Sequence, residues 1–203
     1  MVHEAASAIP EQQSGTVTNT EGEIVLSTQE EARAFFRIVK ERLMNVSIWQ
    51  HLAGQATAKF KLTDGRGNIV NRPPQTGDHL RIDIPGPGSE SGEGYDWVRI
   101  EVVDEEHELG ADCQTIRVRP ATNPTNDKQD IAHFFDEDST SNFMVKRDGN
   151  RVIAGVYGRN EKPNTSAETV IDKLRNTVIA TGAISGFAKI EWKNLVNGLL
   201  KRV

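Results

Sequence analysis

The chain has a single cysteine, Cys113, so it cannot form an internal disulfide bond or a zinc site built mainly from thiolates. It has no run approaching the roughly 18 consecutive apolar residues that a membrane-spanning helix needs. Its first residues lack the basic and apolar regions of a secretory signal. We therefore predict a soluble, cytoplasmic protein with no membrane span.

An excess of positive charge is absent too. The 203 residues include 24 Lys and Arg against 29 Asp and Glu, which gives a formal net charge of −5. Nucleic-acid binding draws much of its affinity from many contacts between cationic side chains and phosphates, so we predict no nucleic-acid partner. The acidic segment 101–112 and the basic C-terminal segment carry opposite charges, which would support a homo-oligomer if the two segments are coplanar; the alternative is ordinary solvated surface. The basic residues are Lys173, Arg175, Lys189, Lys193, Lys201 and Arg202.

None of the short motifs that hold a metal or a cofactor occurs in the sequence. The nearest stretch is the glycine-rich segment 85–96, but its G-P-G-S-E-S-G spacing differs from that of phosphate-binding loops, and a strand rather than a helix follows it. Glu90, Glu93 and Asp96 would also repel a phosphate. We predict no metal and no cofactor, and interpret 85–96 as a mobile acidic surface loop between two strands.

The chain divides into an arm and a domain by composition. Residues 1–22 are polar and show no periodicity, which predicts a flexible N-terminal arm. The whole chain is 36% hydrophobic and 26% charged, as is usual for a globular protein. We expect a single domain over 23–203.

One helix is predicted near the start of that domain. Ser27 and Glu30 have the spacing of a capping box, and apolar residues then recur every three or four positions, which predicts a helix over 28–44. A shorter helical segment continues to Gly54.

A second helical region is predicted at the C-terminus. Thr165 and Glu168 repeat the capping-box spacing ahead of an apolar stripe. Gly182 and Gly186 interrupt the pattern, and a further helix follows from Phe187, so the region is one kinked helix or two.

Between the helical regions the apolar residues alternate, which predicts antiparallel strands with one face toward solvent. In the last hairpin, Asp148-Gly149-Asn150 suits the positive φ angles of a tight turn. The arm 152–157 is apolar on both faces and should lie in the interior of the sheet. The predicted strands there are 56–62, 79–84, 97–103, 114–120, 130–135 and the hairpin 142–158, and a further short strand, 23–27, precedes the first helix.

This order predicts an α+β fold, in which about six to seven strands form a curved antiparallel sheet packed on an N-terminal helix and a long C-terminal helical segment. The order of elements resembles the helix-grip arrangement of START-like and polyketide-cyclase-like domains, which leave a cavity between sheet and last helix. A closed β-barrel with flanking helices and another two-layer sandwich are the alternatives.

Polar groups near predicted strand ends are the candidate ligand-binding residues. Tyr157, Arg159 and Glu161 end the last strand, His133 lies on the apolar face of 130–135, and Trp97 offers a ring for stacking. We predict a non-catalytic module that binds a small apolar or amphipathic ligand between the sheet and the C-terminal helix.

Two other functions stay open. A cyclase- or hydrolase-type enzyme would use His133 or Asp136 as the base, and Arg159 or Tyr157 to stabilise developing negative charge. A protein-interaction domain would use the acidic loop and the edge of the sheet.

Overall fold

The computed structural model describes residues 9–54, 58–84, 88–165 and 184–202, with the backbone alone over 184–189. Within these ranges seven strands form one antiparallel sheet in the order β1-β7-β6-β5-β4-β3-β2. The strands are β1 (Thr16–Val25), β2 (Lys59–Thr63), β3 (His79–Asp83), β4 (Asp96–Glu108), β5 (Ala111–Pro120), β6 (Thr140–Asp148) and β7 (Arg151–Glu161). The helices are α1 (Gln29–Met44), η2 (Val46–Ile48), α2 (Trp49–Ala53) and α4 (Ile184–Leu199).

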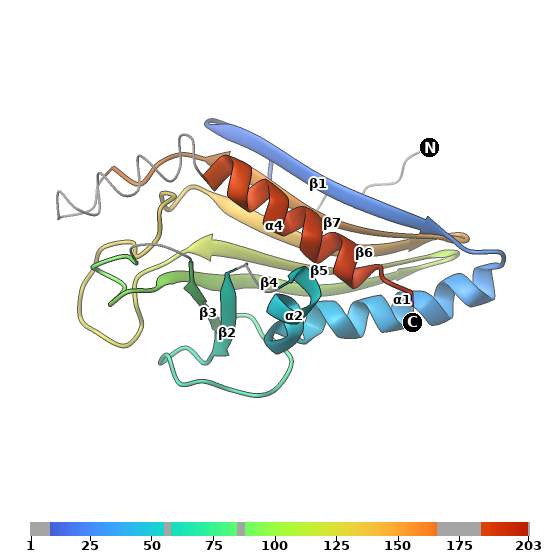
Figure 1. Ribbon diagram of the computed structural model, residues 1–203, viewed down its shortest axis with the longest axis horizontal. Helices are drawn as coiled ribbons and strands as arrows, with labels where there is room; N and C mark the ends of the chain where they lie inside the picture. The colour runs from blue at the N-terminus through green and yellow to red at the C-terminus, as the bar shows by residue number, and fades with distance from the viewer. Residues whose placement is uncertain (1–8, 55–57, 85–87, 166–183, 203) are drawn as a thin grey trace.

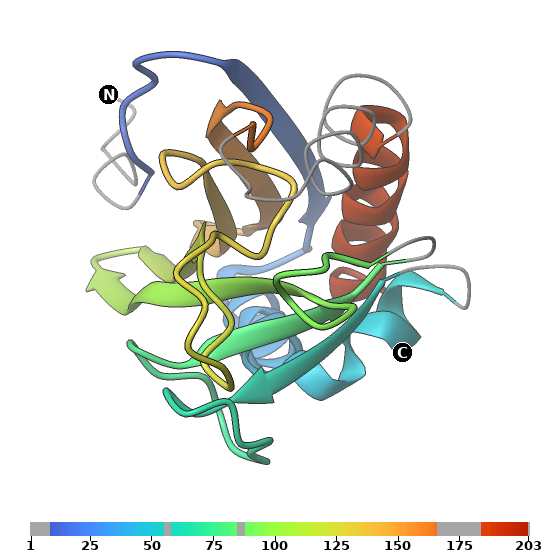
Figure 2. The ribbon, with the colours of Figure 1, turned by 90° about the vertical axis from the view of Figure 1, so that its left-hand side faces the viewer.

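The sheet is curved and open, with β1 and β2 as its two edges (Figure 1). Helix α1 packs on β6 and β7, while α4 packs on β1, β7 and α2. Viewed along the sheet, the strands curve toward α1 and α4 (Figure 2). The α+β fold and its helix-grip arrangement are therefore confirmed, and the closed barrel is wrong because the sheet has two edges. No helix within the described ranges is long and apolar enough to cross a membrane.

Alternation along the strands decides which side of the sheet faces the helices. Residues such as Ile100 and Ile116 belong to the main core, and their neighbours along each strand point to the opposite, outer side. Strand β7 lies between β1 and β6, so its predicted interior position is confirmed. Its even-numbered residues Val152, Ala154 and Val156 face the core.

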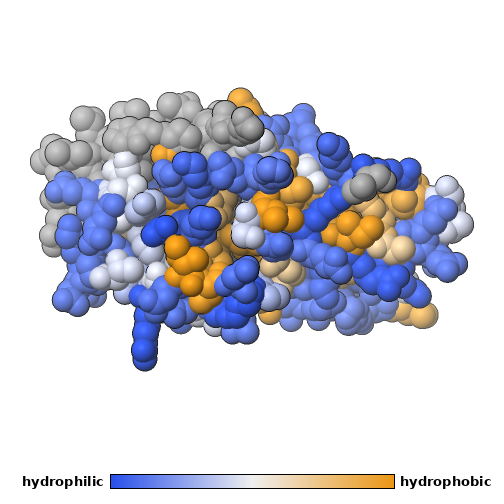
Figure 3. Space-filling model, turned by 60° about the horizontal axis from the view of Figure 1, so that its bottom comes forward, coloured by the Kyte–Doolittle hydropathy of each residue, from blue (hydrophilic) through white to orange (hydrophobic). Residues whose placement is uncertain are grey.

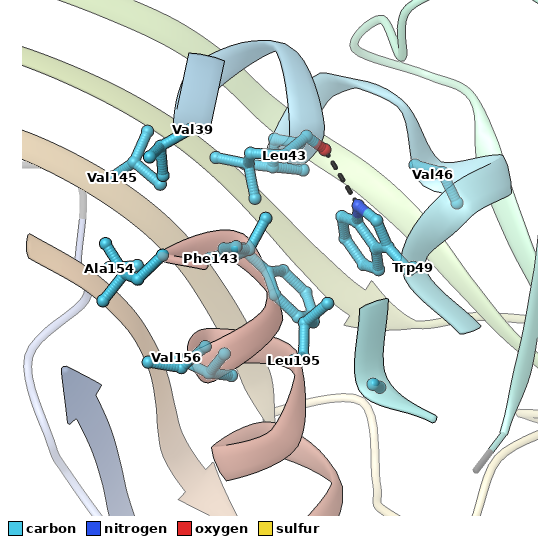
Figure 4. Packing of buried hydrophobic residues seen from close by; sticks show 14 of the residues in the cluster. Val39, Leu43, Val46, Trp49, Phe143, Val145, Ala154, Val156 and Leu195 are labelled. Atoms are coloured by element: carbon cyan, nitrogen blue, oxygen red, sulfur yellow. Dashed lines mark hydrogen bonds between the residues drawn. The ribbon is translucent and has the colours of Figure 1, made fainter. Parts of the chain in front are cut away.

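Aromatic and aliphatic side chains from the sheet and all the helical segments meet in this core (Figure 4). Trp49 is fully buried, and its indole Nε1 donates a hydrogen bond to the Leu43 carbonyl oxygen at 3.0 Å. The Trp49 ring lies 4.7 Å from that of Phe143, which makes an edge contact with Trp192 of α4. These contacts join α2, β6 and α4. Each buried apolar side chain of this kind contributes about 1.5–3 kcal/mol to the free energy of unfolding.

Helix α1 agrees with its prediction except at its first residue. Thr28, rather than Ser27, is the N-cap, and its hydroxyl oxygen accepts a hydrogen bond from the Glu31 N–H at 3.1 Å. The Glu31 carboxylate in turn accepts one from the Ser27 N–H. The reciprocal cap is thus shifted by one residue from the predicted pair, because Thr28 is the residue that takes the extended conformation.

The predicted flexible arm is wrong for residues 16–22, which belong to β1 and pair with β7. Threonine and valine favour an extended backbone, but an edge strand with polar residues on its outer side lacks the apolar alternation that reveals other strands. Ahead of it, Ile9 packs against Cys113, Met144 and Tyr157 on the outer side of the sheet.

The predicted strand over 130–135 is also wrong. This segment lies in the β5–β6 connection, where Phe135 makes a single bridge to Pro163. Ala132, His133 and Phe134 are buried in succession because the segment packs on the sheet. The Ala132 carbonyl accepts the Trp97 N–H, and the Ala132 N–H donates to the Ala121 carbonyl. The apolar residues of this segment are therefore buried without forming a strand of the sheet.

The glycine-rich segment forms a set of turns over residues 88–95, and residues 85–87 lie outside the described residues. Ser89 and Ser91 are buried, and the Ser89 hydroxyl oxygen accepts the Gly92 N–H at 3.2 Å. Glu90 and Glu93 are exposed, as predicted.

In the C-terminal region Gly186 lies inside α4 rather than interrupting it. The predicted cap at Glu168, the stripe after it and Gly182 lie outside the described residues. In the last hairpin Gly149 alone takes a positive φ, of 60°.

Candidate functional site

The loop end of the sheet is the end at which β7 finishes and the segments 88–95 and 121–139 gather (Figure 2). At this end Asn160 has a φ of 56°, in the left-handed region that asparagine tolerates better than most residues. Its side-chain oxygen accepts the N–H groups of Gln13 and Ser14 at 2.8 and 3.1 Å. The N-terminal segment therefore holds a turn of the backbone just before Glu161.

This turn brings the Glu161 carboxylate over Gly158. Its Oε1 accepts a hydrogen bond from the Thr18 hydroxyl at 3.0 Å. A β-carbon on Gly158 would overlap both Glu161 Oε1 and Thr18 Oγ1, so glycine leaves the space that the carboxylate occupies.

The carboxylate lies on the side of the sheet that faces α4. Gly158 shares a face with the core residue Val156, and Thr18 shares one with Gly22. At Gly22 an added β-carbon would lie 3.0 Å from the Val196 side chain of α4. Glu161 thus extends the helix-facing side beyond the apolar core.

Burial raises the pKa of the Glu161 carboxyl, although the hydrogen bond from Thr18 and the charge of Arg159 lower it in part. Ser141, half-buried, is paired with Gly158 on one side and Val118 on the other, and it faces the same way. The loop end of the helix-facing side therefore combines a desolvated acid and two hydroxyls with the apolar surface of the core.

Tyr157 and Arg159 point to the outer side. Tyr157 packs against Cys113 and Met144 there, and burial together with a hydrogen bond to Glu21 raises the pKa of its hydroxyl well above the usual range. The Arg159 guanidinium donates to the carbonyl oxygens of Thr18 and Gly158 at 3.2 and 2.8 Å, and to Asn19. Arg159 therefore fastens β1 to β7.

The other candidates have local partners. The His133 imidazole Nδ1 accepts the Phe135 N–H at 3.0 Å, and its ring stacks on Phe134. The Asp136 carboxylate accepts from the Ser139 hydroxyl at 3.0 Å. Trp97 is buried on the outer side, where its indole N–H donates to the Gly92 carbonyl at 3.3 Å.

Among the sequence-predicted residues the structure thus separates Tyr157, Arg159 and Trp97 on the outer side from Glu161 on the helix-facing side. Sequence reasoning missed Thr18 and Gly158, which carried no local signal. It also missed Glu191 of α4, which is buried and accepts the Ala58 N–H at 2.9 Å. Glu191 lies four positions before Leu195 on the apolar stripe, and this placement could have marked it.

The described residues include no group of three or more His, Cys, Asp and Glu side chains placed to hold a metal ion. Desolvated carboxyl groups beside apolar surface can bind or protonate the polar part of an organic molecule.

No protein-family model and no curated protein sequence matches the chain. Solved structures do match in fold. A hypothetical protein, jhp0584, from Helicobacter pylori aligns with a TM-score of 0.53 at 12% identity, over 98% of this chain and 94% of that one. Truncated norcoclaurine synthase from Thalictrum flavum aligns at 0.40 and 11% identity over 96% and 100%, and Ara h 8.0201 at 0.36 and 11% over 91% and 99%. At these identities the likeness concerns the fold.

Proposed function

We propose that this protein binds a small apolar or amphipathic ligand between the helix-facing side of the sheet and α4, with the polar part of the ligand at Glu161. The observation that supports this most is the position of the Glu161 carboxylate and the groups that hold it there. Taking an acid even partly out of water is costly unless it is well paired. Glu161 is half-buried, and a left-handed turn, a glycine and a hydroxyl hold it beside the apolar core.

The neighbouring side chains define the ligand chemistry that the site would accept. Val118 and Val156 are buried core residues beside the site, and Thr18 and Ser141 carry hydroxyls on the same face. Glu161 accepts hydrogen bonds when ionised and donates one when protonated. A compact apolar body with one polar end would satisfy both parts of this surface.

The catalytic alternative requires His133 or Asp136 to act as a base in one pocket with Arg159 or Tyr157. The His133 and Asp136 side chains bond to their own segment, and the Arg159 guanidinium is occupied by main-chain carbonyls. Binding without catalysis is therefore the function that this geometry supports best.

The experiment is a thermal-shift screen of lipids, aromatic polyketides and organic acids, followed by titration of the compounds that raise the melting temperature. We expect Glu161→Leu to weaken binding of a compound with a polar end at least about tenfold, since a charge-assisted hydrogen bond contributes about 1.5–3 kcal/mol. Glu90→Gln, an exposed acid of the segment 88–95, is the control and should bind like wild type. The proposal fails if no compound stabilises the protein, or if Glu161→Leu binds every compound as well as wild type does.

A further inference from the structure

The outer side of the β4–β5 hairpin carries opposite charges at its two ends. Near the loop end of the sheet lie the arginines of both strands, and near the hairpin turn lie three acids of β4. The arginine end consists of Arg99 and Arg119, and the acidic end of Asp104, Glu106 and Glu108; Arg117 lies between the two ends, across from Val102.

Strand register places these side chains on one side. Arg99 neighbours the core residue Ile100, so it points outward, and Arg119 lies directly across from it on β5. A bulge between Ile100 and Val102 shifts the alternation, so that Asp104 pairs with outward-facing Thr115. Without the bulge, Arg99 and the acids of β4 would lie on opposite sides of the sheet.

The hairpin only partly neutralises its own charges. Glu101 pairs with Arg117 at 3.2 Å and with Arg119 at 2.5 Å. Arg99 of the arginine end and Asp104 and Glu108 of the acidic end are exposed to solvent.

Apolar surface does not distinguish this side. On the face seen in Figure 3, hydrophobic residues form separate patches among hydrophilic ones. The exposed large apolar side chains are scattered over several elements: Val17, Val25, Ile38, Ile69, Leu109 and Ile190. Of the C-terminal cations predicted to complement the segment 101–112, Lys173 and Arg175 lie outside the described residues. The feature that distinguishes the outer side of the β4–β5 hairpin is therefore its separation of charge.

We propose that the partner of this surface is a second copy of the chain. Two hairpins stacked through their outer sides around a twofold axis run in opposite directions, so the acidic end of each lies on the arginine end of the other. An axis between residues 101 and 102 of β4 brings Asp104 of one copy opposite Arg99 of the other. Val102 and its cross-strand partner Arg117 then lie at the centre, where Arg117 is paired with Glu101 of its own chain at 3.2 Å.

Other arrangements fit less well. Hairpins aligned in the same direction would place arginine on arginine and acid on acid, which is unfavourable. A purely acidic or purely basic partner would meet attraction at one end and repulsion at the other. A twofold pair satisfies both ends, and it does so twice in each dimer.

The test uses two charge-reversed variants and sedimentation equilibrium at low and high salt. Arg99→Glu makes the arginine end more acidic, and Asp104→Lys with Glu108→Lys makes the acidic end basic. We expect wild type to dimerise at low salt and dissociate at high salt, and each variant alone to bind itself at least about tenfold more weakly. An equimolar mixture of the two variants should form a heterodimer, because each end then meets its opposite.

Arg33→Glu on α1, an exposed arginine outside the hairpin, changes the net charge as much as Arg99→Glu and should dimerise like wild type. Circular dichroism checks that each variant is folded. A monomeric wild type at low salt and high concentration overturns the proposal. A mixture of the two variants that forms no heterodimer also overturns it. That result would mean that the dimer uses another surface or that the hairpin binds a different protein.

Discussion

Glu191 of α4 accepts a hydrogen bond at 2.9 Å from the main-chain N–H of Ala58, a residue 133 positions earlier. The contact joins the last helix to the start of β2, an edge strand of the sheet. Glu191 is 5% exposed. Burial raises the pKa of its carboxyl to about 7, while the hydrogen bond from Ala58 lowers it in part.

This contact predicts a stability that depends on pH. The folded pKa of Glu191 lies above its model value of 4.5, so the folded protein keeps the proton after the unfolded chain has lost it. Its contribution is fully present below about pH 4.5 and is lost as pH rises through about 7. Glu191→Gln removes the titration and keeps an acceptor for Ala58. Its free energy of unfolding should exceed that of wild type increasingly from about pH 5 to about pH 8, by on the order of 3 kcal/mol.

Urea unfolding of both proteins across this pH range measures the difference. A difference that does not change with pH would show that the Glu191 carboxyl titrates alike in the folded and unfolded chains.

A second prediction concerns the contact between α2 and α4. At Gly198 an added β-carbon would overlap the main-chain carbonyl of Leu52, which cannot move without shifting α2. We expect Gly198→Ala to lower the free energy of unfolding by about 1–3 kcal/mol, although alanine favours a helix. Asn197→Ala, at the exposed neighbouring position, should be neutral or slightly stabilising, and equal effects at the two positions would refute the close approach.

A third prediction concerns Arg147, which is 1% exposed. Its guanidinium donates to the Asp112 carboxylate at 2.6 Å and to the carbonyl oxygens of Gly110 and Gly149, and so joins two hairpin turns. Arg147→Met would leave a largely buried acid and two carbonyls without this donor, and should cost about 3–5 kcal/mol.

The same cluster predicts a dependence on acid. Burial alone would raise the pKa of Asp112, but hydrogen bonds from His107 and Arg147 outweigh it and lower that pKa. The stabilisation from Asp112 is therefore present near neutral pH and is lost as pH falls through its folded pKa. The stability gap between wild type and Arg147→Met should narrow in acid, and guanidinium chloride unfolding in acidic and neutral buffers measures it.

A fourth prediction separates the observed cap of α1 from the one expected by spacing. Thr28→Ala removes the hydroxyl that accepts the Glu31 N–H and should destabilise the protein by about 1 kcal/mol. Ser27 contributes its main-chain N–H, so Ser27→Ala should have little effect. Chemical unfolding measures the free energy of unfolding of both variants. A larger decrease for Ser27→Ala than for Thr28→Ala would show that Ser27 is the N-cap.

The sequence by itself determined the elements whose apolar residues repeat with a clear period. The stripe from Ala32 to Leu43 predicts α1, and the alternation around Ile82 and Ile100 predicts β3 and β4, because burying one face of an element requires that spacing. The order of these elements was sufficient to predict the helix-grip arrangement, since a curved sheet must cover its apolar face with the helices that flank it.

Tertiary structure alone decided which residues form the candidate site. Thr18 and Glu161 lie 143 positions apart and meet because β1 pairs with β7. Local alternation cannot reveal such pairing, and for 130–135 it suggested a strand where the chain only packs on the sheet. The turn at Asn160 then placed Glu161 on the helix-facing side, whereas Tyr157 and Arg159 stayed on the outer side. A single main-chain angle, held by contacts with the N-terminal segment, made this choice, because it reverses which face the following side chain occupies.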